Sequence, residues 1–85
     1  MASYSLEIKK SAARELGELP PKDCTRVAVR IQALAEEPRP HGCEKLSGDE
    51  RYRIRQGVYR VLYEIDDRGA RVTIVKIAHR REAYR

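Results

Sequence analysis

Residues 51 to 79 constrain the fold more than any other part of the sequence, because apolar and polar side chains alternate along them. A period of two is typical of β-strands that bury one face. In "RYRIRQGVYRVLYEID" (51–66), a two-residue turn at Gln56-Gly57 makes a hairpin with Arg53 opposite Arg60. One face of this hairpin then carries Tyr52, Ile54, Tyr59, Val61, Tyr63 and Ile65, and the other carries Arg53, Arg55 and Arg60.

A third strand follows in "ARVTIVKIAHR", after a three-residue turn at 67–69 in which Gly69 takes the left-handed position. This register places Arg60 opposite Lys76 on the arginine face, and Arg80 has the same parity as Lys76. A loop one residue shorter or longer would reverse the assignment. Apolar side chains share this face and favour a protein partner there, namely Val58, Leu62, Val72 and Ile74.

The first half of the chain has a different pattern. "SYSLEI" predicts a strand, and "AARELGEL" predicts a short helix that Ser11 caps and Pro20-Pro21 end. A second helix is predicted over residues 22–37, where the apolar residues at helical spacing are Val27, Ala28, Ile31, Leu34 and Ala35. Residues 39–50 read as a polar loop. Since 85 residues suffice for one core, the sequence predicts a single α+β domain over residues 1–85. Its element order is β-α-α-β-β-β, with both helices packed on one face of the sheet.

Positive charge is concentrated in the C-terminal part of the chain. Residues 1–50 carry 8 Lys or Arg against 9 Asp or Glu, whereas residues 51–85 carry 10 against 4. Like charges opposite each other destabilise a sheet, so an uncompensated cluster of Arg53, Arg55, Arg60, Lys76 and Arg80 predicts a bound anion. The alternative is that these cations only keep an open sheet face from aggregating.

Several classes of protein are disfavoured by the sequence. It contains no apolar stretch of about 18 residues and no secretion signal, so we expect a cytoplasmic protein without a membrane contact. Cys24 and Cys43 have no metal-ligand spacing, and with two histidines in the chain neither a metal site nor another cofactor is expected.

Two segments, "KLSGDERYRIRQGVYRVLYEID" and "VTIVKIAHRREAYR", resemble the RelE branch of the RelE/ParE superfamily of toxins from toxin–antitoxin pairs. The resemblance extends over nearly the whole chain. It implies a ribosome-dependent endoribonuclease that cuts mRNA in the decoding site. It also implies an acidic antitoxin as partner, and a toxin–antitoxin assembly that binds operator DNA through the antitoxin.

The resemblance also assigns roles to residues of the arginine face and the C-terminus. The implied catalytic residues are Arg53, Arg55, Arg60, Arg80 and Tyr84, with His79 and Arg81 as further candidates, and the implied RNA contacts are Lys45, Arg51 and Lys76. Cleavage by the RNA's own 2′-hydroxyl needs no metal, and guanidinium groups suit the charge that develops on phosphorus. Arg55 departs from the family pattern, because a lysine there could act as a base and an arginine cannot. Either Arg53 and Arg55 activate the hydroxyl electrostatically, or another group such as His79 accepts its proton.

The sequence alone leaves two other functions open. The same fold serves ParE-like inhibitors of DNA gyrase, which generally lack the combination of Arg60, Arg80 and Tyr84. A catalytically weakened toxin that only binds its antitoxin as a regulator is the other alternative, and Arg55 gives it some weight.

Overall fold

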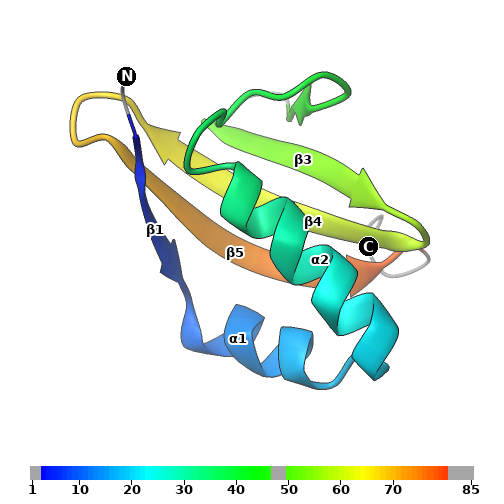
Figure 1. The fold of residues 1–85 in the computed structure, drawn as a ribbon. Coiled ribbons are helices and arrows are strands. Elements are labelled where there is room, and N and C mark those ends of the chain that lie inside the picture. The colour runs from blue at the N-terminus through cyan, green and yellow to red at the C-terminus, as the bar shows by residue number, and fades with distance from the viewer. Residues whose placement is uncertain (1–2, 47–49, 81–85) are drawn as a thin grey trace.

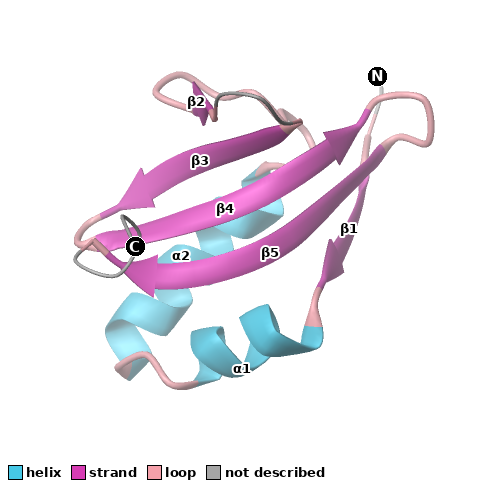
Figure 2. Cartoon of the chain, turned by 180° about the vertical axis from the view of Figure 1, so that it is seen from behind, coloured by secondary structure: helices cyan, strands magenta, loops and turns pink. Residues whose placement is uncertain are grey.

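A computed structural model describes residues 3–46 and 50–80 of the chain. The elements are β1 (Ser5–Ile8), α1 (Lys10–Gly17), α2 (Pro21–Ala33), β2 (Glu44–Lys45), β3 (Arg51–Gln56), β4 (Tyr59–Asp66) and β5 (Arg71–His79). Both helices cover one face of the sheet (Figure 1), and no helix of the described residues covers the opposite face, which Figure 2 shows from behind. The α+β prediction is therefore confirmed, and the short strand β2 is an addition within the predicted polar loop.

The strands form one sheet in the order β1-β5-β4-β3-β2. β1 runs parallel to β5, from Ser5 opposite Arg71 to Ile8 opposite Ile74, and the other pairs are antiparallel. Because β1 ends at Ile8, the second half of β5 has no neighbouring strand on that side and lies beside α1 instead. In the described part of the chain, no helix has the length and apolar character needed to cross a membrane.

The β3–β4 hairpin differs from the predicted register. Arg60 lies opposite Arg55 and not opposite Arg53, and Gln56 pairs with Tyr59. The turn residues are thus Gly57 and Val58, and Gly57 has a φ of 61°, as the first position of a type II′ turn requires. Since the whole register moves by two residues, the predicted division of side chains between the two faces is retained.

The β4–β5 connection was predicted wrongly in two respects. Its loop has four residues, 67–70, and the left-handed residue is Ala70 (φ 51°) and not Gly69. The extra residue turns Val72 and Ile74 into the core, where both are fully buried, and not onto the arginine face. The register shifts between Leu62 and Tyr63, so that Val75 has no partner on β4. Beyond Val75, the side chains of β5 therefore lie on the faces that the sequence predicted for them.

The helices also begin and end differently from the prediction. Lys9 is the N-cap of α1 and makes no side-chain cap bond, so the predicted cap Ser11 lies inside the helix. α2 begins at Pro21, where a missing amide costs nothing, and ends at Ala33 and not at Glu37. Beyond Ala33 the backbone continues in tighter turns, such as the bond from the Ala35 N–H to the Gln32 carbonyl at 3.1 Å.

The core lies between the helices and the covered face of the sheet. It consists of Ala12, Val27, Ile31, Leu34, Tyr52, Ile54, Val61, Tyr63, Ile65, Val72, Ile74 and Ile77. Tyr63 is fully buried and its hydroxyl donates to the Pro38 carbonyl at 2.7 Å, while burial raises the pKa of this phenol. The core thus takes up one face of the sheet and leaves the other for the arginines.

Candidate functional site

The open face of the sheet brings the predicted arginines into two neighbouring rows. One row across β3, β4 and β5 is Arg55, Arg60 and Ala78, and the next is Arg53, Leu62 and Lys76. We call the first row, together with Arg53, the open-face arginine site. The methyl group of Ala78 leaves room beside the long Arg60 side chain, which lies at the centre of its row.

Arg60 is the most unusual charged residue of the site, because it is only 7% exposed. Its Nη1 donates to the Tyr59 carbonyl at 3.3 Å, and its Nε is buried without a hydrogen-bond partner among the described residues. Arg55 is the residue directly opposite Arg60 in the β3–β4 hairpin, so the Arg60 row contains a second guanidinium. A buried cation without a carboxylate is unfavourable in a low dielectric, so this position is suited to an anion.

Arg53 and Arg55 are in a different electrostatic state, because Glu44 of β2 lies beside them. The Glu44 Oε1 is 3.0 Å from the Arg53 Nη2 and 3.9 Å from the Arg55 Nη2. The side chain of Arg53 is only 15% exposed, whereas that of Arg55 is 57% exposed and lies at the longer distance from the carboxylate. The expectation of an uncompensated cluster is therefore wrong for these two residues, since a carboxylate already holds them.

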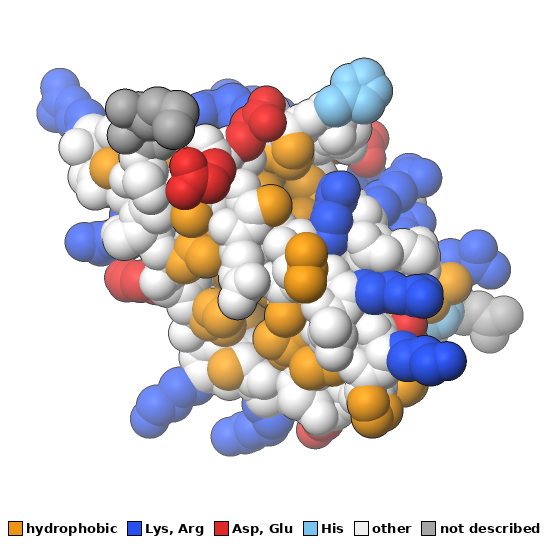
Figure 3. Space-filling view, viewed as in Figure 1, with side chains coloured by type: hydrophobic (Ala, Val, Ile, Leu, Met, Phe, Trp, Pro, Cys, Tyr) orange, Lys and Arg blue, Asp and Glu red, His pale blue; other side chains and the backbone are white. Residues whose placement is uncertain are grey.

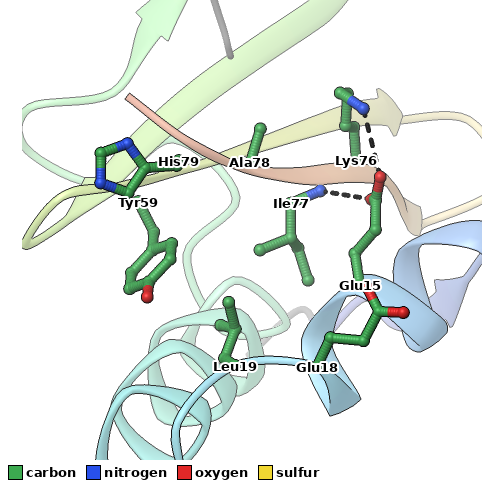
Figure 4. Close-up of a pocket in the computed structure, with 8 residues that line it drawn as sticks. All are labelled: Glu15, Glu18, Leu19, Tyr59, Lys76, Ile77, Ala78 and His79. Atoms are coloured by element: carbon green, nitrogen blue, oxygen red, sulfur yellow. Dashed lines mark hydrogen bonds and ion pairs between the residues drawn. The ribbon is translucent and has the colours of Figure 1, made fainter. Parts of the chain in front are cut away.

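Lys76 is also paired, by a residue of α1. Its side chain leaves β5 on the same side as Ala78, opposite to Ile77, and its Nζ then lies 3.1 Å from the Glu15 Oε2 (Figure 4). The other oxygen of Glu15 accepts the Ile77 N–H at 2.9 Å, at the edge of β5 that β1 leaves open. The ammonium group of Lys76 is thus held at the sheet edge, toward the helices.

His79 lies on the other side of β5 from the open-face arginine site. It pairs with Tyr59, and the two rings meet edge to face with their centroids 5.9 Å apart. Both residues line a pocket of about 190 Å³ between β5 and α1, as Figure 4 shows. Arg80 is exposed, and its N–H donates to the Val58 carbonyl at 2.7 Å, so its register is that of the open face.

The remaining predicted residues lie farther from Arg60 or outside the described part of the chain. Arg51 pairs with Glu64 (Nε to Oε2, 3.1 Å), and the exposed Lys45 lies 3.9 Å from Glu50. Arg81 and Tyr84 fall in the segment 81–85, which is outside the described residues. Within residues 3–46 and 50–80, no group of three or more His, Cys, Asp or Glu side chains could hold a metal ion.

Sequence reasoning missed the two carboxylates that hold the cations, Glu44 and Glu15. Glu44 belongs to a strand of two residues, which is too short for a period to be visible. Glu15 reaches β5 from a helix 61 residues earlier in the chain. Neither contact has a local pattern that could have predicted it.

Comparison with known proteins places the chain beside bacterial and archaeal toxins. Residues 6–84 match the family described as "ParE toxin of type II toxin-antitoxin system, parDE". The chain is 34% identical to "Toxin RelG" of Mycobacterium tuberculosis over 96% of this chain and 97% of that protein. It is 35% identical to "Putative toxin RelE1" of Methanocaldococcus jannaschii, over 96% of each protein.

Solved structures give the same result for the fold. The toxin–antitoxin complex RelBE2 of M. tuberculosis contains a chain that matches with a TM-score of 0.82 and 30% identity, over 93% of both chains. The archaeal RelE–RelB complex of Pyrococcus horikoshii matches with a TM-score of 0.84 and 29% identity, over 94% of this chain and 98% of that one.

Proposed function

The chain belongs to the RelE/ParE family of toxins of type II toxin–antitoxin systems, and from that membership we propose that it cleaves messenger RNA in the decoding site of the ribosome. The proposal takes residues 1–85 as one toxin domain that acts in the cytoplasm. The observation that carries it is Arg60, a nearly buried guanidinium without a carboxylate among the described residues.

In the proposed reaction, the 2′-oxygen of the RNA attacks the adjacent phosphorus and the 5′-oxygen leaves with a proton. A 2′,3′-cyclic phosphate forms on one fragment and a 5′-hydroxyl on the other. Negative charge grows on the non-bridging oxygens at the transition state, and Arg60 is the cation preorganised to receive it. Because the attacking group belongs to the RNA, this route requires no metal ion.

The other arginines take supporting roles in this proposal. Arg53 is fixed by Glu44 and helps to set the positive potential around the 2′-hydroxyl. Arg55 lies opposite Arg60 and has the exposure needed to turn toward a phosphate. Arg80 adds charge at the end of β5, and Tyr84 is proposed to stack on a base.

An antitoxin is the proposed protein partner. The matching structure from M. tuberculosis is the toxin–antitoxin complex RelBE2, and the one from P. horikoshii is a RelE–RelB complex. In such a complex, acidic residues of the antitoxin would neutralise Arg60 and its neighbours, and the assembly would bind operator DNA through the antitoxin.

Removing the Arg60 guanidinium tests the proposal. We expect Arg60→Ala to reduce single-turnover cleavage of mRNA on programmed ribosomes by about 10² or more, the usual loss for one preorganised donor. The control is Arg71→Ala, which removes an exposed cation of β5 that pairs with Glu7. A second variant, Arg60→Met, should unfold at the same temperature as the wild type or higher, because it removes an uncompensated buried charge. Near-normal cleavage by a folded Arg60→Ala variant would contradict the assignment.

A ParE-like inhibitor of DNA gyrase is the second candidate, because the family profile that matches the chain carries the ParE name. This function would leave mRNA on programmed ribosomes intact. After induction in cells, thymidine incorporation would then stop before methionine incorporation does. For the ribonuclease, methionine incorporation would stop before thymidine incorporation does.

A further inference from the structure

The outer surface of α2 carries a row of cations that none of the roles above uses. Lys22, Arg26 and Arg30 follow one another at intervals of four residues, so they lie along one flank of the helix. The residues that α2 buries, Val27 and Ile31, point to the core. Lys and Arg side chains gather on the right-hand side of the helix face in Figure 3, beside α2. We call Lys22, Arg26 and Arg30 the α2 cation ridge.

No residue of the ridge forms an ion pair or a side-chain hydrogen bond with any part of the chain that the structure describes. The one carboxylate of α2, Asp23, accepts the Tyr59 hydroxyl at 3.4 Å. Most basic residues of the described strands differ from the ridge, since Arg51, Arg53, Arg71 and Lys76 each have a carboxylate partner and Arg60 is the exception among them.

The ridge works against the stability of its own helix. Like charges at i and i+4 repel each other, and the row contains two such pairs. Lys22 is in the first turn, where the helix dipole disfavours a cation. Exchanging Lys22 for a glutamate would relieve the dipole effect and one of the two repulsions, whereas Arg30 is in the last turn, where the dipole favours a cation. The arrangement is therefore better explained by an anionic ligand than by helix stability.

The geometry of the ridge decides which anion fits. Three cations separated by about 6 Å along a straight helix make a linear positive track. An acidic protein helix would also need apolar anchors, and Val29 is the one large apolar side chain that α2 exposes strongly. A phosphate backbone needs charge and little apolar area.

We propose that the α2 cation ridge binds the phosphate backbone of structured RNA, on the face of the molecule opposite to the open-face arginine site. The helices and the arginines lie on different sides of the sheet, so the two surfaces can be occupied together. This second RNA contact does not depend on cleavage, and it would persist if the open face had another function.

Binding to a 20-base-pair RNA hairpin tests the proposal, measured by fluorescence anisotropy over a range of potassium chloride concentrations. All proteins carry Arg60→Ala, so that neither cleavage nor this arginine contributes. The ridge variant is Lys22→Gln, Arg26→Gln and Arg30→Gln. The matched control is Lys9→Gln, Lys10→Gln and Arg14→Gln, which removes the same charge from the start of α1 and its first turns.

We expect the ridge variant to bind the hairpin at least tenfold more weakly at about 0.1 M salt, with the slope of log K against log salt smaller by about 2 to 3. The control should change affinity by less than threefold. Equal losses in both variants would mean that only net charge matters, and would overturn the proposal. Unchanged RNA binding with lost binding of polyglutamate would assign the ridge to an acidic protein and would also overturn it. Cleavage on ribosomes is measured separately with Arg60 intact, so failure here is distinguishable from failure of the proposed function.

Discussion

At the scale of single residues, the arginines of the open face differ in what surrounds them and not in type. Arg53 is held by Glu44 at 3.0 Å, whereas Arg60 has no carboxylate within the described residues. A guanidinium that is already neutralised offers less to a phosphate than one that is not. Arg60 is therefore the strongest candidate for stabilising the transition state, and Arg53 is better suited to positioning and potential.

The pH dependence of cleavage should reveal how the 2′-hydroxyl is activated. If Arg53 and Arg55 act as fixed cations, no protein group at the site titrates near neutrality. We then expect the single-turnover rate to rise across about pH 6 to 9 without a plateau, following the ionisation of the hydroxyl itself. His79→Gln should have the same profile, because His79 lies on the helix side of β5 beside Tyr59.

Two other results would contradict this electrostatic route. A plateau in the wild-type profile that disappears in His79→Gln would make the histidine the base. A flat profile that becomes a rising one in Glu44→Gln would assign the base to Glu44, since an ordinary carboxylate is ionised throughout this range.

At the scale of secondary-structure elements, alternation predicted which side chains of β3 and β4 share a face, but it could not fix the register. A shift by two residues leaves the faces unchanged, and this is the shift that Gly57 produces in the β3–β4 hairpin. A shift by one residue exchanges the faces, and the four-residue β4–β5 loop does this to Val72 and Ile74. Loop length and the irregularity at Val75 depend on contacts across the sheet, so the sequence pattern alone could not supply them.

The β4–β5 loop offers a test of stability. Ala70 has a φ of 51°, which an alanine adopts with strain and a glycine adopts freely. We expect Ala70→Gly to raise the free energy of unfolding by about 0.5 to 1 kcal/mol, a relief that exceeds the extra chain entropy of glycine. For a chain of this size the gain corresponds to about 3 to 6 °C in Tm.

Gly69→Ala is the matched control for that measurement. A Cβ there would lie 2.5 Å from the Asp66 Oδ2, and Asp66 accepts the Gly69 N–H at 3.0 Å. This substitution should lower the Tm. If Ala70→Gly lowered it as well, the backbone of the loop would not be the one described.

At the scale of the whole molecule, the distribution of unpaired charge differs from the distribution of net charge. The sequence places the positive excess after residue 50, yet several cations there have carboxylate partners. The three cations of α2 have none among the described residues, although the first half of the chain is nearly neutral. Pairing depends on contacts such as Glu15 to Lys76, which join distant segments, so composition could predict the arginine site but not the α2 cation ridge.

The far end of the molecule from the β3–β4 turn is held together by one polar cluster. The Asp67 carboxylate of the β4–β5 loop accepts hydrogen bonds from both terminal nitrogens of Arg39, at 3.2 and 2.9 Å. It also accepts one from the Tyr4 hydroxyl, at 2.7 Å. Arg39 also donates its Nε to the Tyr52 hydroxyl at 3.2 Å. The cluster thus joins the start of β1, the segment after α2 and the β4–β5 hairpin.

Acid should weaken this cluster through Asp67. The bonds from Arg39 and then from Tyr4 lower the pKa of the Asp67 carboxyl below its ordinary value in the unfolded chain, about 3.9. The stability that Asp67 contributes is therefore fully present above about pH 5 and is lost as the pH falls through the lower, folded pKa. We expect Asp67→Asn to unfold at a lower urea concentration than the wild type at pH 7, and the difference to shrink toward pH 2.5.

Glu36→Gln, a change at an exposed carboxylate without an ion pair in the described chain, should show no such convergence with the wild type. A difference between wild type and Asp67→Asn that stays constant down to pH 2.5 would show that the cluster does not depend on the charge of Asp67.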